Sequence, residues 1–144
     1  MKPVVIRAIS TAARASAVVS GCMLLASSLH GGAPWAGINA MTNAVGRGAR
    51  RPNAHFQGKQ TLLGMGILCG GLPVMSGVYE AALNRMPSRR GVLSGTAFAL
   101  AGYGIDRLLL PAKLLQSFGR SMGPTGTFAK YAALGIAAAA PGGR

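Results

Sequence analysis

Four stretches of the chain are almost continuously apolar or small, and each is bounded by basic residues, glycine or proline. They cover residues of about 11–30, 61–83, 91–110 and 126–140. A helix that crosses a bilayer needs about 20 apolar residues, with a range near 17–25, and the first three stretches reach that length while the fourth is short. The pattern predicts an all-α integral membrane bundle of four transmembrane helices, formed by residues 1–144 as a single membrane domain.

The segment of about 34–46 does not have the continuous apolar pattern of the four spans. Trp35, Ile38, Met41 and Val45 recur in it at helical spacing, whereas Asn39 and Asn43 fall on another side. This pattern predicts a short interfacial helix after the first span, with Trp35 as its anchor in the headgroup region. A surface loop with a single tryptophan is the alternative. 

Basic and helix-breaking residues separate the spans. The turn that holds Arg85, Arg89 and Arg90 is short and strongly basic, so the preference for positive charge on the cytoplasmic side favours placing it there. With an even number of spans, both termini then lie in the cytoplasm. Pro73 should kink the second span, and residues 112–125 are predicted to form a linker.

Composition supports the membrane assignment. Hydrophobic residues make up 50% of the 144 residues, charged residues only 12%, and the formal net charge is +13. A soluble domain carries about 25% charged residues of both signs. The basic residues flank apolar runs instead of forming one stripe, so we expect anionic lipid headgroups of the bilayer as their partners and no nucleic acid.

Small residues recur in the spans at the spacing of close helix contacts. Gly66 and Gly70 form one GxxxG pair, and Gly91 and Gly95 form a second. Such pairs allow helix backbones to approach closely inside a membrane. We therefore predict these four glycines as helix-packing positions, used either within the chain or against a partner.

Both acidic residues of the chain, Glu80 and Asp106, lie within predicted spans. A charged carboxylate at the bilayer centre costs at least about 2.5–3.5 kcal/mol on insertion scales, so each should have a basic partner. Those partners are expected among Lys130 and Lys113 for Asp106, and among Arg14 and Arg85 for Glu80. Interhelical ion pairs that fix packing are the favoured interpretation, and a proton or ion relay is the alternative.

Motifs of soluble enzymes are missing from the sequence. The two histidines have no cysteine at metal-binding spacing, the glycine-rich stretch lacks the Lys-Ser/Thr of a phosphate loop, and no nucleophile elbow is present. Cys22 and Cys69 lie in apolar runs and are expected to act as small hydrophobic residues. We therefore expect no metal, no cofactor and no enzymatic activity.

Three short motifs resemble an uncharacterised family of small four-span proteobacterial inner-membrane proteins. They are the run Ala33-Pro34-Trp35-Ala36-Gly37-Ile38-Asn39-Ala40, the run Val78-Tyr79-Glu80, and the end of the third span, Asp106-Arg107-Leu108-Leu109-Leu110-Pro111 with Lys113. The histidines that accompany the family's first motif and second span are missing here, where the chain has residues 41–43 and 72–75. The resemblance implies location and architecture only.

Two functions fit these observations. The first is a non-enzymatic structural or accessory protein, a helix-packing module that forms a homo-oligomer or binds a membrane-protein partner. The alternative is a small transporter or channel subunit that uses Asp106 and the Pro73 kink. A wet cavity lined by Asp106, Tyr103 and Lys130 would favour transport, and a dry one would favour packing.

Overall fold

The computed structural model describes residues 3–31, 33–45, 53–86, 91–109 and 112–140, and within these ranges the chain is helical with no strand. The elements are α1 (Pro3–Gly31), α2 (Ala36–Ala40), the 3-10 helix η1 (Met41–Val45), α3 (Gly58–Asn84), α4 (Val92–Leu109) and α5 (Ala112–Ala139). The prediction of an all-α fold is confirmed.

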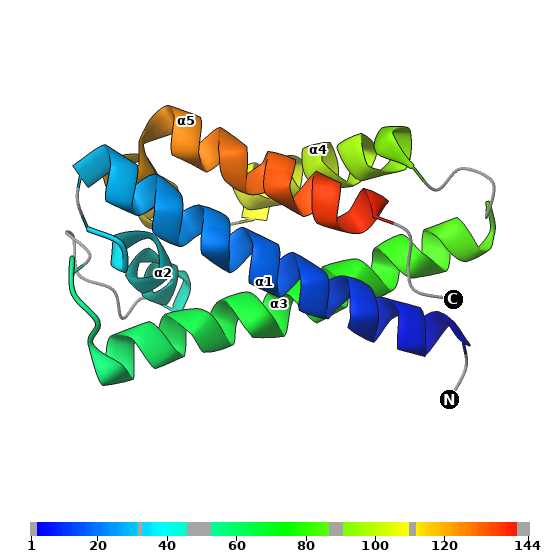
Figure 1. The fold of residues 1–144 in the computed structure, drawn as a ribbon, viewed down its shortest axis with the longest axis horizontal. Helices are drawn as coiled ribbons and strands as arrows, with labels where there is room; N and C mark the ends of the chain where they lie inside the picture. Colours follow the sequence, from blue (N-terminus) through cyan, green and yellow to red (C-terminus); the bar gives the residue numbers. More distant parts are fainter. Residues whose placement is uncertain (1–2, 32, 46–52, 87–90, 110–111, 141–144) are drawn as a thin grey trace.

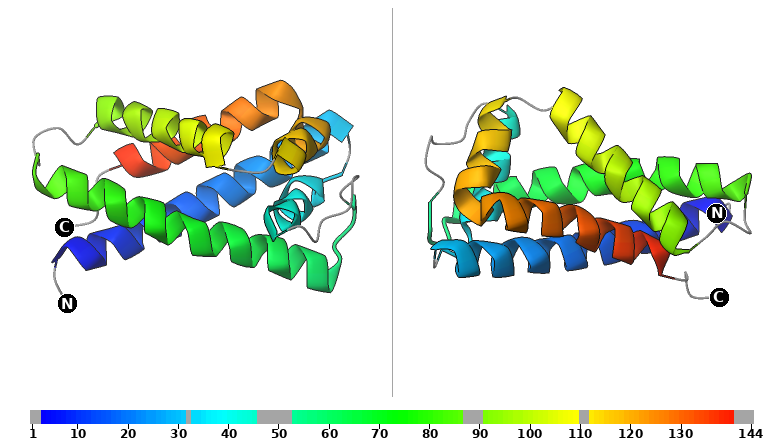
Figure 2. Two further views of the ribbon diagram at one scale, coloured as in Figure 1. Left: turned by 180° about the vertical axis from the view of Figure 1, so that it is seen from behind. Right: turned by 90° about the horizontal axis from the view of Figure 1, so that it is seen from above.

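The four long helices alternate in direction, as Figure 1 shows. α5 packs against both α1 and α4, and α1 packs in turn against α3 (Figure 2). The start of α1 and the end of α5 lie at the same end of the bundle, where Nη1 of Arg14 donates a hydrogen bond of 3.2 Å to the carbonyl of Ala140. An even number of long helices therefore brings the two ends of the described chain together.

Two helices are long and apolar enough to cross a membrane by length and composition, namely residues 4–31 of α1 and α3. α4 has only 18 residues, and they include the charged pair Asp106-Arg107. α5 has 28 residues, but its backbone is interrupted at Gly123. These features explain why α4 and α5 carry a weaker membrane signal than the sequence pattern suggested.

Large apolar side chains cover the outside of the long helices. Leu29 is 80% exposed, Val78 is 69% exposed and Leu108 is 86% exposed. Exposure of such side chains on all four long helices is unfavourable in water, whereas lipid tails solvate them without cost. The outer surface is therefore consistent with a membrane environment.

The segment predicted as a linker, residues 112–125, is the first part of α5 and is helical. Its buried residues are Leu114, Ser117, Phe118, Ser121 and Met122, which follow the spacing of one helix face. The linker prediction was wrong because lysine, arginine, two glycines and a proline in this segment were interpreted as breaks. Only one of them, Gly123, breaks the helix.

Gly123 adopts φ 67° and ψ 176°, and Pro124 follows it directly. A positive φ of this size favours glycine, and proline cannot supply the backbone N–H that a continuous helix needs. A side chain at Gly123 would also meet the ring of His30, whose Nδ1 lies 2.8 Å from the position of an added Cβ. The kink turns the first part of α5 towards η1.

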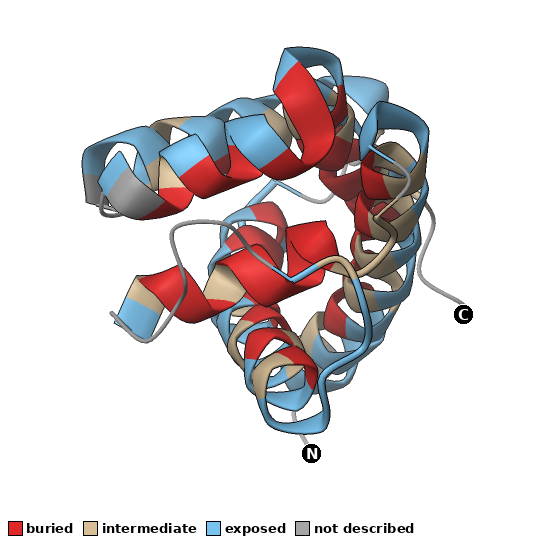
Figure 3. Cartoon of the chain, turned by 90° about the vertical axis from the view of Figure 1, so that its left-hand side faces the viewer, coloured by how far each residue is buried: buried red, intermediate tan, exposed pale blue. Residues whose placement is uncertain are grey.

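The short helix α2 lies inside the bundle, and Figure 3 shows it among the buried segments between the longer helices. All five of its residues are buried, and residues of η1 are buried beside it. Nδ2 of Asn43 connects η1 to α5 through a 2.9 Å hydrogen bond to Oγ of Ser117. The helix predicted over 34–46 is thus present, but it lacks the exposed polar face of an interfacial helix.

Small residues allow α2 to enter this position. A Cβ added to Gly64 of α3 would lie 2.2 Å from the carbonyl oxygen of Ile38, and one added to Gly37 would lie 2.6 Å from Oγ of Ser27. That hydroxyl accepts a 3.0 Å hydrogen bond from the backbone N–H of Gly37. The close approach of α2 to α3 therefore depends on Gly64, and its close approach to α1 depends on Gly37.

Candidate functional site

The candidate site is the charged cluster where α4 crosses α5. Nζ of Lys130 lies 3.0 Å from Oδ2 of Asp106, and the two side chains are only 9% and 19% exposed. The structure thereby confirms the predicted ion pair between Asp106 and Lys130. The other predicted partner, Lys113, has a side chain that lies outside the described residues.

Two aromatic residues complete the cluster, and sequence analysis assigned neither of them to it. The hydroxyl of Tyr131 donates a hydrogen bond to the same Oδ2 of Asp106. The ammonium of Lys130 lies 4.2 Å from the ring centroid of Phe118 and 4.3 Å from that of Tyr131, which are distances of cation–π contacts. Phe118 comes from the part of α5 before the Gly123 kink, so no helical spacing could have connected it to Lys130.

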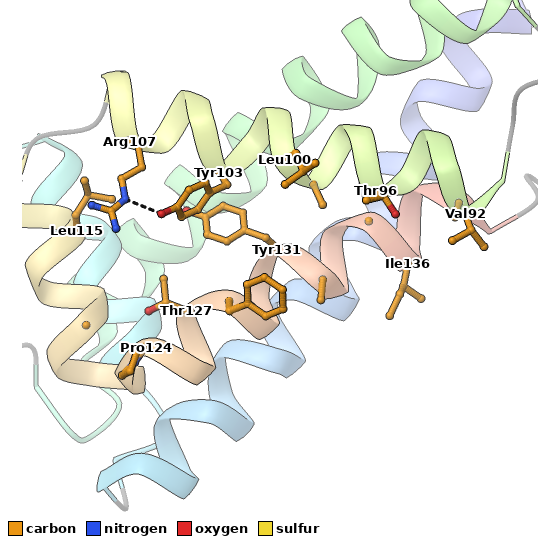
Figure 4. Close-up of a pocket in the computed structure, with 16 residues that line it drawn as sticks. Val92, Thr96, Leu100, Tyr103, Arg107, Leu115, Pro124, Thr127, Tyr131 and Ile136 are labelled. Carbon is orange, nitrogen blue, oxygen red and sulfur yellow. Dashed lines mark hydrogen bonds between the residues drawn. The ribbon is translucent and has the colours of Figure 1, made fainter.

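A groove of about 980 Å³ adjoins this cluster and is open along one side between α4 and α5 (Figure 4). Its walls are mainly apolar and extend from Val92 and Ile136 at one end to Tyr103 and Arg107 at the other. Neither Asp106 nor Lys130 is among its lining residues. Because its walls are mainly apolar, this groove resembles the dry cavity expected of a packing protein more than the wet cavity expected of a transporter.

Two side chains of α4, Arg107 and Tyr103, form the polar end of the groove. Nε of Arg107 donates a 3.1 Å hydrogen bond to the hydroxyl of Tyr103, and the guanidinium carbon lies 5.4 Å from the centroid of that ring. The ring of Tyr103 meets the ring of Tyr131 edge-on, with centroids 5.4 Å apart. Arg107 is therefore held at the mouth of the groove, as Figure 4 shows.

The second acidic residue, Glu80, lies in a different cluster and is 1% exposed. Its Oε1 accepts a 2.7 Å hydrogen bond from the hydroxyl of Thr11, and that hydroxyl accepts a 3.3 Å hydrogen bond from Nη2 of Arg14. The hydroxyl of Thr11 therefore connects Glu80 to Arg14, which was one of its two predicted partners. Sequence analysis did not identify Thr11 as part of this cluster. Arg85, the other predicted partner, is exposed at the end of α3.

Tyr79, the neighbour of Glu80, joins three helices. Its hydroxyl lies 3.0 Å from Oγ of Ser94 in α4 and donates a 3.3 Å hydrogen bond to the carbonyl of Ala138 in α5. Its ring packs against Phe98 with centroids 4.6 Å apart. The Val78-Tyr79-Glu80 motif thus supplies contacts that connect α3 to α1, α4 and α5.

The four predicted glycines have different environments. A Cβ added to Gly95 would lie 2.4 Å from the carbonyl oxygen of Gly135, so Gly95 packs α4 directly against α5. Gly91 precedes α4, and an added Cβ would meet nothing within 4 Å. Gly66 and Gly70 are exposed on α3 and have the same open surroundings. Within the chain, only Gly95 therefore makes the predicted close contact.

The Trp35 side chain is half-buried and meets the ring of Phe56 edge-on, with centroids 5.2 Å apart. Beside it, Nδ2 of Asn39 donates hydrogen bonds of 2.9 and 3.2 Å to the carbonyls of Asn53 and His55, and Oδ1 accepts one of 2.8 Å from Thr61. These contacts fix the start of α3 against α2. The role of Trp35 as an interfacial anchor stays a prediction.

Within the described ranges, no three His, Cys, Asp or Glu side chains gather as a metal site would require. Comparison of the chain with protein-family models, with curated proteins and with solved structures finds no match in any of the three. The resemblance to small four-span inner-membrane proteins therefore stays a prediction, and function has to be argued from the geometry.

Proposed function

We propose that the chain is a non-enzymatic helix-packing module of the bacterial inner membrane, in which the four long helices span the bilayer and both termini are cytoplasmic. In this proposal it acts as a structural or accessory protein and assembles with a second copy of itself. The single observation that carries the proposal is a stripe of glycines on α3 at which an added Cβ would meet nothing within 4 Å.

The glycine stripe consists of Gly66, Gly70 and Gly77, at spacings of four and seven residues on one side of α3. A Cβ added to any of the three would meet nothing within 4 Å. Inside the bundle, by contrast, Gly64 on the other side of the same helix contacts the backbone of Ile38. Small residues at this spacing are the typical contact surface of membrane helices, and no described part of the chain covers the stripe.

The charged groups also fit a packing role. Asp106 is paired with Lys130, and Glu80 accepts a hydrogen bond from Thr11 inside the bundle. Each carboxylate thereby joins two helices, α4 to α5 and α3 to α1. Such contacts fix the arrangement of helices, and they need no substrate to explain them.

The proposed dimer can be tested with a cysteine that the chain already has. All copies in a membrane have the same orientation, so a two-fold dimer places the two α3 helices parallel, with each residue near its own copy. Cys69 is exposed next to Gly70, and cysteines whose Cα atoms lie about 4.4–6.8 Å apart can form a disulfide. Mild oxidation of a Cys22→Ser variant in native membranes should therefore give a covalent Cys69–Cys69 dimer.

The matched variants lie on the same helix. Gly66→Leu or Gly70→Leu should abolish the crosslinked dimer and shift the detergent-solubilised particle to the monomer mass. Gly71→Leu is the control, since Gly71 is exposed with open surroundings but lies off the stripe. Dimers that persist in both stripe variants, or a chain that is monomeric throughout, would refute self-assembly through α3. Co-purification of a different membrane protein that both stripe variants release would instead identify the accessory form of the function.

The alternative is a small transporter or channel subunit. The observation that favours it is the carboxylate of Asp106, which is 19% exposed near the groove, although the walls of the groove itself are apolar. If protons or ions move past this carboxylate, Asp106→Asn should abolish a pH-dependent flux in proteoliposomes. The absence of flux for any ion or small solute with the unaltered protein would remove this alternative.

A further inference from the structure

We infer that the groove between α4 and α5 is a binding site for an anionic phospholipid, with an acyl chain along the apolar walls and the phosphate at Arg107 and Tyr103. This inference concerns a different surface from the glycine stripe and does not depend on self-assembly.

The dimensions of the groove fit an acyl chain. Its volume of about 980 Å³ is at the upper end of ordinary ligand sites, which measure about 300–1,000 Å³. At about 1.5 Å per residue, the α4 wall from Val92 to Arg107 is about 22 Å long, which exceeds the roughly 15 Å half-thickness of the hydrocarbon core. One acyl chain can therefore lie within it along its full depth in one leaflet.

Small side chains make the groove hollow. Gly95 and Gly135 bring α4 and α5 into backbone contact, while the walls beside this contact carry Thr96 and Ala132, both exposed. Larger side chains project further out along the walls, including Leu100 and Ile136 (Figure 4). The result is an apolar channel that is open towards lipid along one side.

The polar end offers hydrogen-bond donors without an acceptor. Among the described residues that line the groove, Arg107 is the only charged one. In the described part of the chain, its guanidinium uses only Nε, which donates to Tyr103. A guanidinium has five N–H donors, so its two terminal nitrogens remain available, as does the hydroxyl proton of Tyr103. A phosphate is the group that such a planar set of donors binds best.

A second copy of this chain offers no free acidic side chain to these donors. The chain has only two acidic residues against 15 basic ones. Of the acids, Asp106 is paired with Lys130 and Glu80 is 1% exposed and bonded to Thr11. A helix from another copy would therefore bring no free carboxylate to Arg107. Charge complementarity thus favours the phosphate of an anionic lipid over a protein helix as the occupant.

The test measures the binding of the first lipid to the full chain by native mass spectrometry from dodecyl maltoside micelles. Dioleoyl phosphatidylglycerol and dioleoyl phosphatidylcholine have the same acyl chains and differ in net charge. We expect tighter binding of phosphatidylglycerol. Arg107→Gln should weaken its binding about fivefold, which corresponds to the roughly 1 kcal/mol of one basic residue near an anionic surface. It should weaken phosphatidylcholine less, because the choline cation of that lipid already compensates the charge of its phosphate. Arg85→Gln, an exposed arginine outside the groove, is the matched control.

A second set of variants tests the apolar part of the site. Ala132→Leu should fill the groove and weaken both lipids at least fivefold, while Ala17→Leu on the exposed side of α1 should change neither more than twofold. Thr96→Leu fills the groove from the opposite wall, and it decides the question if Ala132→Leu does not fold. Inorganic phosphate at millimolar concentration should not displace the lipid, because it lacks the acyl chain.

Three results would overturn the inference. Equal losses in Arg107→Gln and Arg85→Gln would show that the lipid responds only to general positive charge. Unchanged binding in both groove-filling variants would place the lipid elsewhere on the protein. A change from dimer to monomer in those variants would show that a helix of a second copy occupies the groove.

Discussion

Removing the ammonium of Lys130 should destabilise the fold strongly, because it leaves the partly buried carboxylate of Asp106 without the counter-ion that the structure shows. Lys130→Met keeps an unbranched side chain of similar length. It removes the 3.0 Å ion pair with Asp106 and the cation–π contacts with Phe118 and Tyr131. Among the described residues, Tyr131 alone would then still donate a hydrogen bond to Asp106.

The magnitude follows from the burial of the pair. Removal of one partner from a buried ion pair costs about 3–5 kcal/mol, whereas replacement of both partners by neutral groups is often harmless. Asp106 is 19% exposed and keeps one hydrogen bond, so we expect the lower value, about 3 kcal/mol, for Lys130→Met. Asp106→Asn should cost a similar amount, since it leaves Lys130 unpaired at 9% exposure. The double variant should lose only about 1 kcal/mol, because no isolated charge remains.

The assay is a double-mutant cycle on the purified chain in dodecyl maltoside, unfolded with sodium dodecyl sulfate. Trp35 is the only tryptophan of the chain and packs against Phe56, so its fluorescence reports unfolding without a label. Lys59→Met, at an exposed position near the start of α3, is the control for the loss of one positive charge. Additive losses in the double variant, or a Lys130→Met variant as stable as Lys59→Met, would refute the role of the ion pair in packing.

Three further substitutions test the interior around α2 and the kink. Gly64→Ala should cost several kcal/mol or displace α2, because the added Cβ would lie 2.2 Å from the carbonyl oxygen of Ile38; the same detergent titration measures the loss. Gly123→Ala should destabilise by at least about 1 kcal/mol through its positive φ and further through His30, so that His30→Ala recovers part of the loss in a double variant. Asn39→Ala should cost about 2–3 kcal/mol, because several buried hydrogen bonds disappear together, and it should increase hydrogen exchange at the start of α3.

The number of long helices and their apolar middle parts could be predicted because apolar runs are local features, whereas the starts of α1 and α5, at Pro3 and Ala112, were missed. The Asp106–Lys130 pair could also be predicted, since a carboxylate in an apolar span requires a cation and few are available. Tyr131 and Phe118 could not, because their approach depends on the angle between the two parts of α5. That angle follows from the backbone of Gly123. Pro124, directly after it, marks a break in the sequence, but it does not give the direction in which the helix turns.

The burial of α2 was unpredictable for a related reason. Periodicity identifies a helix that has one apolar side, but it cannot recognise a helix that is enclosed on every side. In α2 the small residues allow close approach, and Asn39 satisfies its side chain with backbone carbonyls of the loop before α3. The loop and α3 supply these partners only after the chain has folded around α2. A polar residue at such a position therefore looks like a surface residue until its partners are known.

The two kinds of glycine in α3 bear on the function directly. Gly64 faces inward, where its lack of a side chain permits backbone contact with Ile38. At Gly66, Gly70 and Gly77 an added Cβ would meet nothing within 4 Å, yet glycine in a helix interior costs about 0.8–1.0 kcal/mol relative to alanine. Three such positions on one stripe lower the stability of the isolated helix by about 3 kcal/mol with no compensating contact in the described chain. Close packing of a second helix against the stripe would offset that cost, which is why the outward glycines, and not the inward ones, indicate assembly.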